Sequence, residues 1–251
     1  MIRYKNRKQI DGIRSSCKLL VKMYNELAPL VVPGTREIEL ERWAQDWITK
    51  HGARPAFLGY GPRENPFPAA LCISINEKVI HGIPSRRRIM HGDLVSIDSG
   101  LEFNGYFSDK SVTFEAGTVS DAARRLNVVT RECLYKAIAA AKAGDRLFAI
   151  GRAVENHAAA AGYGIVEEFC GHGVGLALHE DPHVPNKPSR GPNPRLREGM
   201  VLAIEPMINQ GTGEIELLDD DWTIVTADRR LSAHWEHTIA IFNDHTEILT
   251  E

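Results

Sequence analysis

The sequence has no long apolar run, no closely spaced cysteines and little net charge. No stretch approaches the roughly 20 apolar residues that a membrane-spanning helix needs. Residues 1–8 are basic and polar, so we expect no signal peptide. The four cysteines form no C-x-x-C pair, which excludes a zinc knuckle and argues against a disulfide scaffold. We therefore expect a cytoplasmic protein with reduced thiols.

The charge balance also argues against some classes of partner. The formal net charge is −3 over 251 residues, which gives no overall field for nucleic acid or anionic lipid. The basic run Arg86–Arg88 is typical of a solvated loop. We expect neither a membrane-bound protein nor a sequence-specific nucleic-acid binder.

Four amphipathic helices are predicted from apolar residues at helical spacing. They cover roughly residues 10–27, 35–51, 126–143 and 150–161. The pairs Gly34/Gly52 and Gly144/Gly162 have the same separation, and each pair brackets a helix with a capping residue just after the first glycine. The repeat predicts one domain, 1–251, with two similar halves at approximately 1–115 and 116–251.

Strand-like segments lie between and after these helices. They cover residues 71–75, 93–98, 107–114, 200–204 and 236–242. Glycine-containing turns at 103–106 and 211–213 fit hairpins. Antiparallel strands with separate helices predict an α+β fold.

Four carboxylates stand at the predicted ends of apolar strands: Asp98, Asp109, Glu205 and Glu236. Taken singly, each is best explained as a strand-end residue paired with an arginine. As a group they would repel one another unless a divalent cation lies between them. The glycine-rich stretch "GHGVGLALHE" adds two histidines, His172 and His179. Four carboxylates with one imidazole suit a pair of Mn, Fe, Co or Zn ions with a bridging water.

Several motifs in this order and spacing resemble the type I, bacterial methionine aminopeptidases. They are "INEKVIHGIP", "DLVSIDSG", "GYFSD", "CGHGVGLALHE", "VLAIEPM" and "DWTIVTADRRLSAHWEHTI". They extend over most of the chain and are highly specific as a set. The resemblance implies the pita-bread fold, a curved antiparallel sheet covered by helices, with two halves related by a pseudo-twofold axis. It also implies removal of the initiator methionine from nascent proteins and peptides.

The resemblance further implies a dinuclear metal site, in which a metal-bridging hydroxide acts as the nucleophile. The implied ligands are Asp98, Asp109, His172, Glu205 and Glu236, with Asp109 and Glu236 bridging the ions. Glu205 would also act as the general base. His179 would stabilise the oxyanion, and His81 would position the peptide backbone. The ligand types leave the identity of the ions open.

The resemblance places an apolar pocket for methionine beside this site. Its implied walls are Tyr60, Phe67, Cys72, Leu178 and Trp222, with Phe57 near the rim. Two features depart from the family pattern: "GPRENP" makes the loop between Tyr60 and Phe67 longer, and Phe57 and Leu178 replace common residues. A monovalent cation near Asn76 and Ser232 is also expected from relatives.

Two other functions are compatible with this fold. One is an Xaa-Pro aminopeptidase or dipeptidase, although such relatives generally carry a large additional N-terminal domain. The other is a metal-free binding module, which would be expected to lose at least one ligand, whereas none is lost here. The expected partners are nascent peptide or protein N-termini, with transient association with the ribosome, and the resemblance favours a monomer.

Overall fold

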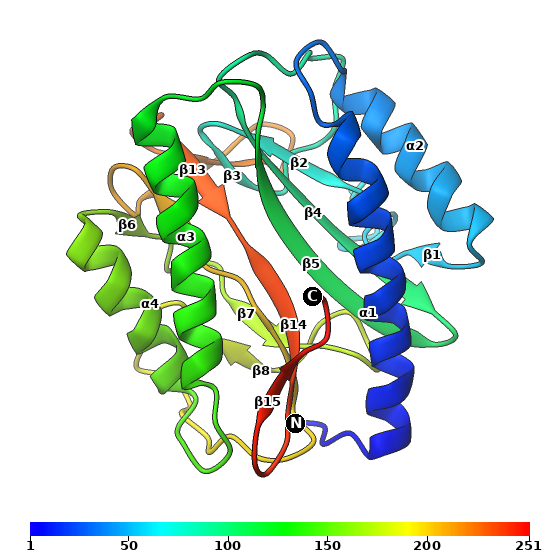
Figure 1. Cartoon of the computed structure of the whole chain (residues 1–251), viewed down its shortest axis with the longest axis vertical. Coiled ribbons are helices and arrows are strands. Elements are labelled where there is room, and N and C mark those ends of the chain that lie inside the picture. Colours follow the sequence, from blue (N-terminus) through cyan, green and yellow to red (C-terminus); the bar gives the residue numbers. More distant parts are fainter.

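The computed structural model describes residues 1–251 as a curved antiparallel sheet with four α-helices on its convex side (Figure 1). Helices α1 (Arg7–Leu27) and α2 (Glu37–Lys50) cover one part of the sheet. Helices α3 (Asp121–Ala140) and α4 (Phe148–Ala161) cover the other part. The predicted α+β class is confirmed. None of the helices combines the length and apolar character needed to span a bilayer.

The ends of the helices follow local capping chemistry. Helix α1 starts with a capping box, in which Asn6 and Gln9 each accept a hydrogen bond from the other's backbone N–H. It ends in a short 3₁₀ turn, Ala28–Leu30, which contains the helix-breaking Pro29. Helices α2 and α4 end as predicted, because Gly52 and Gly162 adopt positive φ angles of 72° and 79°.

The predicted N-terminal caps of α2 and α4 are wrong by one and two residues, respectively. The residues that precede the helices are Arg36 and Leu147, so neither Thr35 nor Asp145 caps a helix. At Arg36 the side chain of Glu39 accepts the backbone N–H, which supplies the missing cap.

The main sheet contains nine strands in the order β1-β4-β5-β14-β9-β7-β8, with β2 beside β4 and β15 beside β14. The strands are β1 (Arg54–Pro55), β2 (Cys72–Ile75), β4 (Leu94–Phe103), β5 (Tyr106–Glu115), β7 (Gly171–Gly173), β8 (Glu180–Val184), β9 (Val201–Ile204), β14 (Glu236–Ile241) and β15 (Thr246–Ile248). Strands from both halves of the chain are therefore joined in one sheet. The hairpin predicted at 103–106 is confirmed, since Asn104 and Gly105 both have positive φ between paired Phe103 and Tyr106.

Two small three-stranded sheets flank the main one. The first contains β6 (Gly164–Ile165), β10 (Met207–Asn209) and β13 (Ser232–His234), and the second contains β3 (Lys78–Ile80), β11 (Ile215–Leu217) and β12 (Ile224–Thr226). The hairpin predicted at 211–213 is wrong, because β10 and β11 belong to different sheets. A Cβ on Gly213 would lie 2.2 Å from the carbonyl oxygen of Ile165. This glycine therefore allows close backbone packing.

Each pair of helices packs on its own part of the sheet. Leu20 and Leu40 of α1 and α2 share a core with Ile97 of β4. A second core joins α3 and α4 to other strands and includes Leu126 and Ile239. The two helix pairs therefore pack into separate cores.

Candidate active site

Three neighbouring strands bring three of the predicted carboxylates together. Ser111 of β5 pairs with Asp98 of β4 on one side and with Glu236 of β14 on the other. Asp109 is two residues from Ser111 and therefore points to the same face. Asp98 and Asp109 were expected at strand ends, but both lie inside ten-residue strands. The sheet backbone, rather than a loop, sets the spacing of these acids.

The remaining two predicted ligands come from β7 and β9. His172 of β7 pairs with Ala203 of β9, and Glu205 follows two residues later. The flanking glycines allow this strand to fit, since a Cβ on Gly171 or Gly173 would lie 2.3 Å from a neighbouring carbonyl oxygen. This close packing explains why His172 lies between two glycines.

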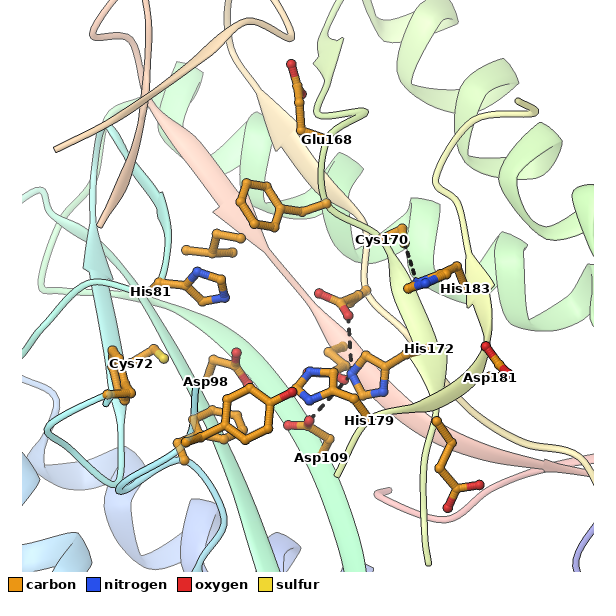
Figure 2. A pocket seen from close by; sticks show the side chains of 18 of the residues that line it. Cys72, His81, Asp98, Asp109, Glu168, Cys170, His172, His179, Asp181 and His183 are labelled. Atoms are coloured by element: carbon orange, nitrogen blue, oxygen red, sulfur yellow. Dashed lines mark hydrogen bonds and ion pairs between the residues drawn. The ribbon is translucent and has the colours of Figure 1, made fainter. Parts of the chain in front are cut away.

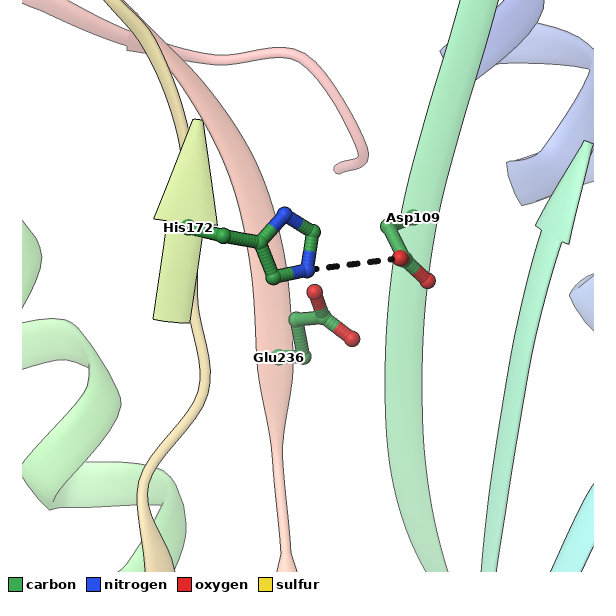
Figure 3. Close-up of side chains that lie close together, drawn as sticks. All are labelled: Asp109, His172 and Glu236. Carbon is green, nitrogen blue, oxygen red and sulfur yellow. Dashed lines mark ion pairs between the residues drawn. The ribbon is translucent and has the colours of Figure 1, made fainter. Parts of the chain in front are cut away.

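His172 faces the acids through its Nε2 atom. Its Nδ1 lies 2.9 Å from the carbonyl oxygen of Gly173, which favours a proton on Nδ1 and a free lone pair on Nε2. The Nε2 atom lies 3.7 Å from Oδ2 of Asp109 and 3.6 Å from Oε1 of Glu205. Figure 3 shows the imidazole, Asp109 and Glu236 converging on one point. Their ligand atoms lie within 4.8 Å of one another.

The donor set fits divalent metal ions. Oδ1 of Asp98 and Oε1 of Glu236 are buried and have no hydrogen-bond partner. Such atoms are costly to bury unless a cation or a donor satisfies them. Carboxylate oxygens with one imidazole nitrogen suit borderline ions such as Mn, Fe, Co and Zn.

Burial and mutual repulsion disfavour the charged form of these acids. Burial raises the pKa of Asp98 well above its usual range, and the charge of Glu205 raises it further. The pKa values of Asp109 and Glu205 are raised well above their usual range by burial, then by a neighbouring aspartate. Burial and three neighbouring acids do the same for Glu236. Without a cation the cluster retains protons, so its chemistry depends on what neutralises it.

The three predicted site histidines are held neutral. Burial, followed by the charge of His179, lowers the pKa of His172 to about 3. Burial lowers the pKa values of His179 and His81 to about 4, with smaller contributions from His183 and His179, respectively. A neutral imidazole can bind a metal through one nitrogen or donate one N–H to a substrate.

The acids lie in a cavity of about 610 Å³ that has a polar part and an apolar part (Figure 2). Phe57, Phe67, Cys72 and Trp222 line the apolar part, with Tyr60 at the exposed rim. The Phe67 and Trp222 rings meet edge to face at 5.2 Å between centroids. All the predicted site residues line the cavity except Leu178, which is buried in the cluster containing Phe57, Phe67 and Cys72.

The long loop between Tyr60 and Phe67 packs on Trp222. The indole Nε1 of Trp222 donates to the carbonyl oxygen of Asn65 at 3.1 Å, and Asn65 Nδ2 donates to the carbonyl oxygen of Asp220 at 3.3 Å. A Cβ on Gly61 would lie 2.5 Å from the indole ring. The loop thus holds one wall of the apolar part.

The remaining predicted residues lie close to one another or to the cavity. His81 lies 6.0 Å from Trp222 and 5.4 Å from Phe169, between ring centroids. His179 lies 4.1 Å from His172 and 4.9 Å from Tyr60. These distances place His179 beside both His172 and the rim residue Tyr60, and His81 beside the aromatic wall.

Asn76 and Ser232 are also neighbours, since the backbone N–H of Ser232 donates to the carbonyl oxygen of Asn76 at 2.8 Å. Asn76 has a positive φ of 59°. The two residues therefore lie beside each other in the fold.

Sequence reasoning missed two features of this region. His234 lies 3.6 Å from Glu205, and strand alternation with Glu236 could have indicated it. Cys170 and His183 form a pair in the cavity lining, with Sγ 3.7 Å from Nδ1. That pair depends on the register of β7 and β8, which has no signal in the sequence.

Comparisons with known proteins agree with this geometry. The model of metallopeptidase family M24 matches residues 11–243. The methionine aminopeptidase of Treponema pallidum is 52% identical over 252 aligned positions, covering 100% of this chain and 97% of that protein. The methionine aminopeptidase structure from Thermotoga maritima has a TM-score of 0.95 and 37% identity, with 100% of both chains covered.

A solved prolidase from Pyrococcus furiosus shares the fold less closely. Its TM-score is 0.80 and its identity 26%, with 99% of this chain but 65% of that chain covered. The likeness to these structures confirms the predicted pita-bread fold.

Proposed function

Since the chain belongs to metallopeptidase family M24, we propose that it is a metal-dependent aminopeptidase that removes N-terminal methionine from nascent proteins and peptides. The observation that carries the proposal is the cavity itself, in which buried acids and His172 adjoin an apolar part. The named relatives support the choice of methionine.

Five side chains would hold two divalent ions of still open identity. The proposed ligands are Asp98, Asp109, His172, Glu205 and Glu236, with Asp109 and Glu236 shared between the ions. The unpartnered oxygens of Asp98 and Glu236 support this assignment. When bound, the ions would act as Lewis acids that make a water molecule lose a proton near neutral pH, so that it can attack a peptide.

Other steps fall to this chain's own residues. Glu205 accepts the proton of the attacking water and returns it to the leaving amine. His179 donates a hydrogen bond to the carbonyl oxygen as negative charge develops on it. His81 holds the backbone after the scissile bond. The substrate's free amine binds beside Asp98, which restricts cleavage to the N-terminus.

The methionine side chain would occupy the apolar part of the cavity. Phe67, Cys72 and Trp222 line this part, and Tyr60 lies at its rim. A flexible, unbranched thioether fits such walls well. Leu178 does not line the cavity and would support these walls by packing against their aromatic residues.

Several broader features belong to the same proposal. The chain would act as one catalytic domain, 1–251, and as a cytoplasmic monomer. Its partners would be emerging N-termini, with transient association with the ribosome. A monovalent cation bound near Asn76 and Ser232 would stabilise the connection between β2, β3 and β13; the adjacency of the two residues supports it.

The test is a peptide-cleavage assay with controlled metal. EDTA should abolish cleavage of Met-Ala-Ser, and added Mn²⁺ or Co²⁺ should restore it. An Ala-Pro dipeptide, the kind of substrate that an Xaa-Pro dipeptidase cleaves, should remain intact under the same conditions. Cleavage of Ala-Pro in preference to Met-Ala-Ser would replace the proposal with the Xaa-Pro alternative. No cleavage and no metal binding would favour a binding module.

A further inference from the structure

The carboxylate of Glu205 lies between two imidazoles. Its Oε1 atom is 3.6 Å from Nε2 of His172, and its Oε2 atom is 3.6 Å from Nε2 of His234. The main chain at Glu205 is also held, because Asn186 Nδ2 donates to its carbonyl oxygen at 3.0 Å. Each oxygen of this carboxylate therefore faces a different ring.

His234 has no other polar partner for the nitrogen that faces Glu205. Its side chain is 1% exposed, and Nε2 has no hydrogen bond. A buried N–H without a partner is costly, so a neighbouring charged acceptor will attract it. The carboxylate of Glu205 provides that acceptor with little movement.

The position of the ring is fixed by its backbone. The hydroxyl of Thr113 on β5 accepts the N–H of His234 at 3.0 Å and donates to its carbonyl oxygen at 2.7 Å. His234 also pairs with Met207 in the flanking sheet, two residues after Glu205. The imidazole and the carboxylate are thus held on rigid, adjoining segments.

The imidazole of His234 is buried against the carboxylate of Glu205. A neutral imidazole protonated on Nε2 is a hydrogen-bond donor, which complements a carboxylate oxygen.

We propose that His234 is a positioning residue, whose Nε2–H binds Oε2 of Glu205 and thereby directs Oε1 toward His172 and the metal-binding acids. The inference deepens the proposed function, on which it rests, by assigning a partner to the carboxylate that moves the proton. A carboxylate with one oxygen held in this way keeps the other free for an ion or a water proton.

A role as an additional metal ligand is the main alternative. All five proposed ligands line the cavity, whereas His234 does not. It lies behind Glu205, which favours positioning over ligation.

The test compares His234→Ala with His234→Gln by titrating the metal-free protein with Co²⁺ and recording its visible absorption. Glutamine keeps an N–H donor, whereas alanine does not. Loss of an outer partner of a ligand typically costs about 10–100-fold in affinity or activity. We expect His234→Ala to weaken Co²⁺ binding about tenfold and lower kcat to a similar extent, with KM nearly unchanged. His234→Gln should recover both to within about threefold of the wild type, with two ions still bound.

Two further variants separate positioning from general damage. His234→Leu removes the donor while filling the volume, and it should behave like His234→Ala even if alanine destabilises the fold. Trp235→Phe removes the hydrogen bond from the adjacent indole to Asn127 and should lower thermal stability without weakening Co²⁺ binding.

Three results would overturn the role of His234. They are unchanged Co²⁺ binding and kcat in both donor-free variants, a glutamine variant as weak as alanine, or loss of one ion per chain. A wild-type protein that binds Co²⁺ but leaves Met-Ala-Ser intact would instead reject the proposed function, while the Co²⁺ titration would still test the contact with Glu205.

Discussion

The two parts of the cavity are built from different kinds of structure. The acids come mainly from long paired strands, where Asp98, Ser111 and Glu236 form a row across three strands. The apolar walls come mainly from loops, including the 61–66 segment that holds Trp222. The rigid sheet thus carries the charges, whose positions tolerate little error, while loops form the surface that selects the side chain.

The largest expected effect comes from removing a shared ligand on the strands. Asp109→Ala should abolish metal binding and lower kcat/KM by more than about 100-fold. Loss of a residue that only contacts a metal ligand costs at most about that much. Metal analysis and Met-Ala-Ser cleavage would measure both. Ser111→Ala, on the same face, should keep both ions. Full activity in Asp109→Ala would remove the basis of the two-metal proposal.

The two histidines of the glycine-rich segment lie at the boundary between the polar and apolar parts of the cavity, and we expect them to have different roles. His172→Ala should lower metal occupancy. His179→Ala should keep the metals and lower kcat about 10²–10³-fold, as loss of one oxyanion donor typically does. Metal content and kcat measured on the same samples separate these outcomes. Equal loss of metal from both variants would contradict the division of roles.

The apolar part should affect substrate binding rather than metal binding. Trp222→Ala removes a wall of the cavity and should raise KM for Met-Ala-Ser about tenfold, the scale of small losses in an apolar pocket. Metal content should be unchanged. Trp43→Ala, in helix α2 away from the cavity, is the matched control and should leave KM near the wild-type value. A Trp222 variant with depleted metal would break the separation of the two parts.

The smallest effect concerns the stability of the metal-free protein. The raised pKa of Asp98 means that the folded state holds a proton that the unfolded state releases above about pH 4. The free-energy cost that Asp98 imposes on folding therefore grows as the pH rises toward its pKa in the folded state. Metal-free Asp98→Asn should melt above the metal-free wild type, by about 2–4 °C for each kcal/mol removed, and the difference should grow from pH 5 to pH 8. Calorimetry at several pH values would detect a constant or reversed difference, which would argue against repulsion in the cluster.

Local chemistry explains which parts of the fold were predictable. The hairpin at 103–106 follows from two adjacent residues that tolerate positive φ. The similar signal at 211–213 failed because Gly213 packs closely against Ile165 and Gly211 against the side chain of Asp228, which are contacts between separate segments. A glycine in a sequence does not reveal which of these two needs it meets.

The same distinction applies to the site. The motifs around Asp98 and Glu236 were sufficient to nominate the acids, because buried carboxylates need a common reason. They did not nominate His234, although it adjoins Glu236 by strand alternation. Its importance depends on contact with Glu205, 29 positions earlier in the sequence.

By itself, the sequence determined the helices, the main strands, the family and the residue types of a metal site, because periodicity, turn chemistry and motif order are local properties. The tertiary structure decided which oxygens lack partners, that Leu178 lies behind the cavity wall, and that His234 faces Glu205. These features arise from strand register and from packing between distant segments. Register moves whole sets of side chains from one face of a sheet to the other, and no local pattern specifies it completely.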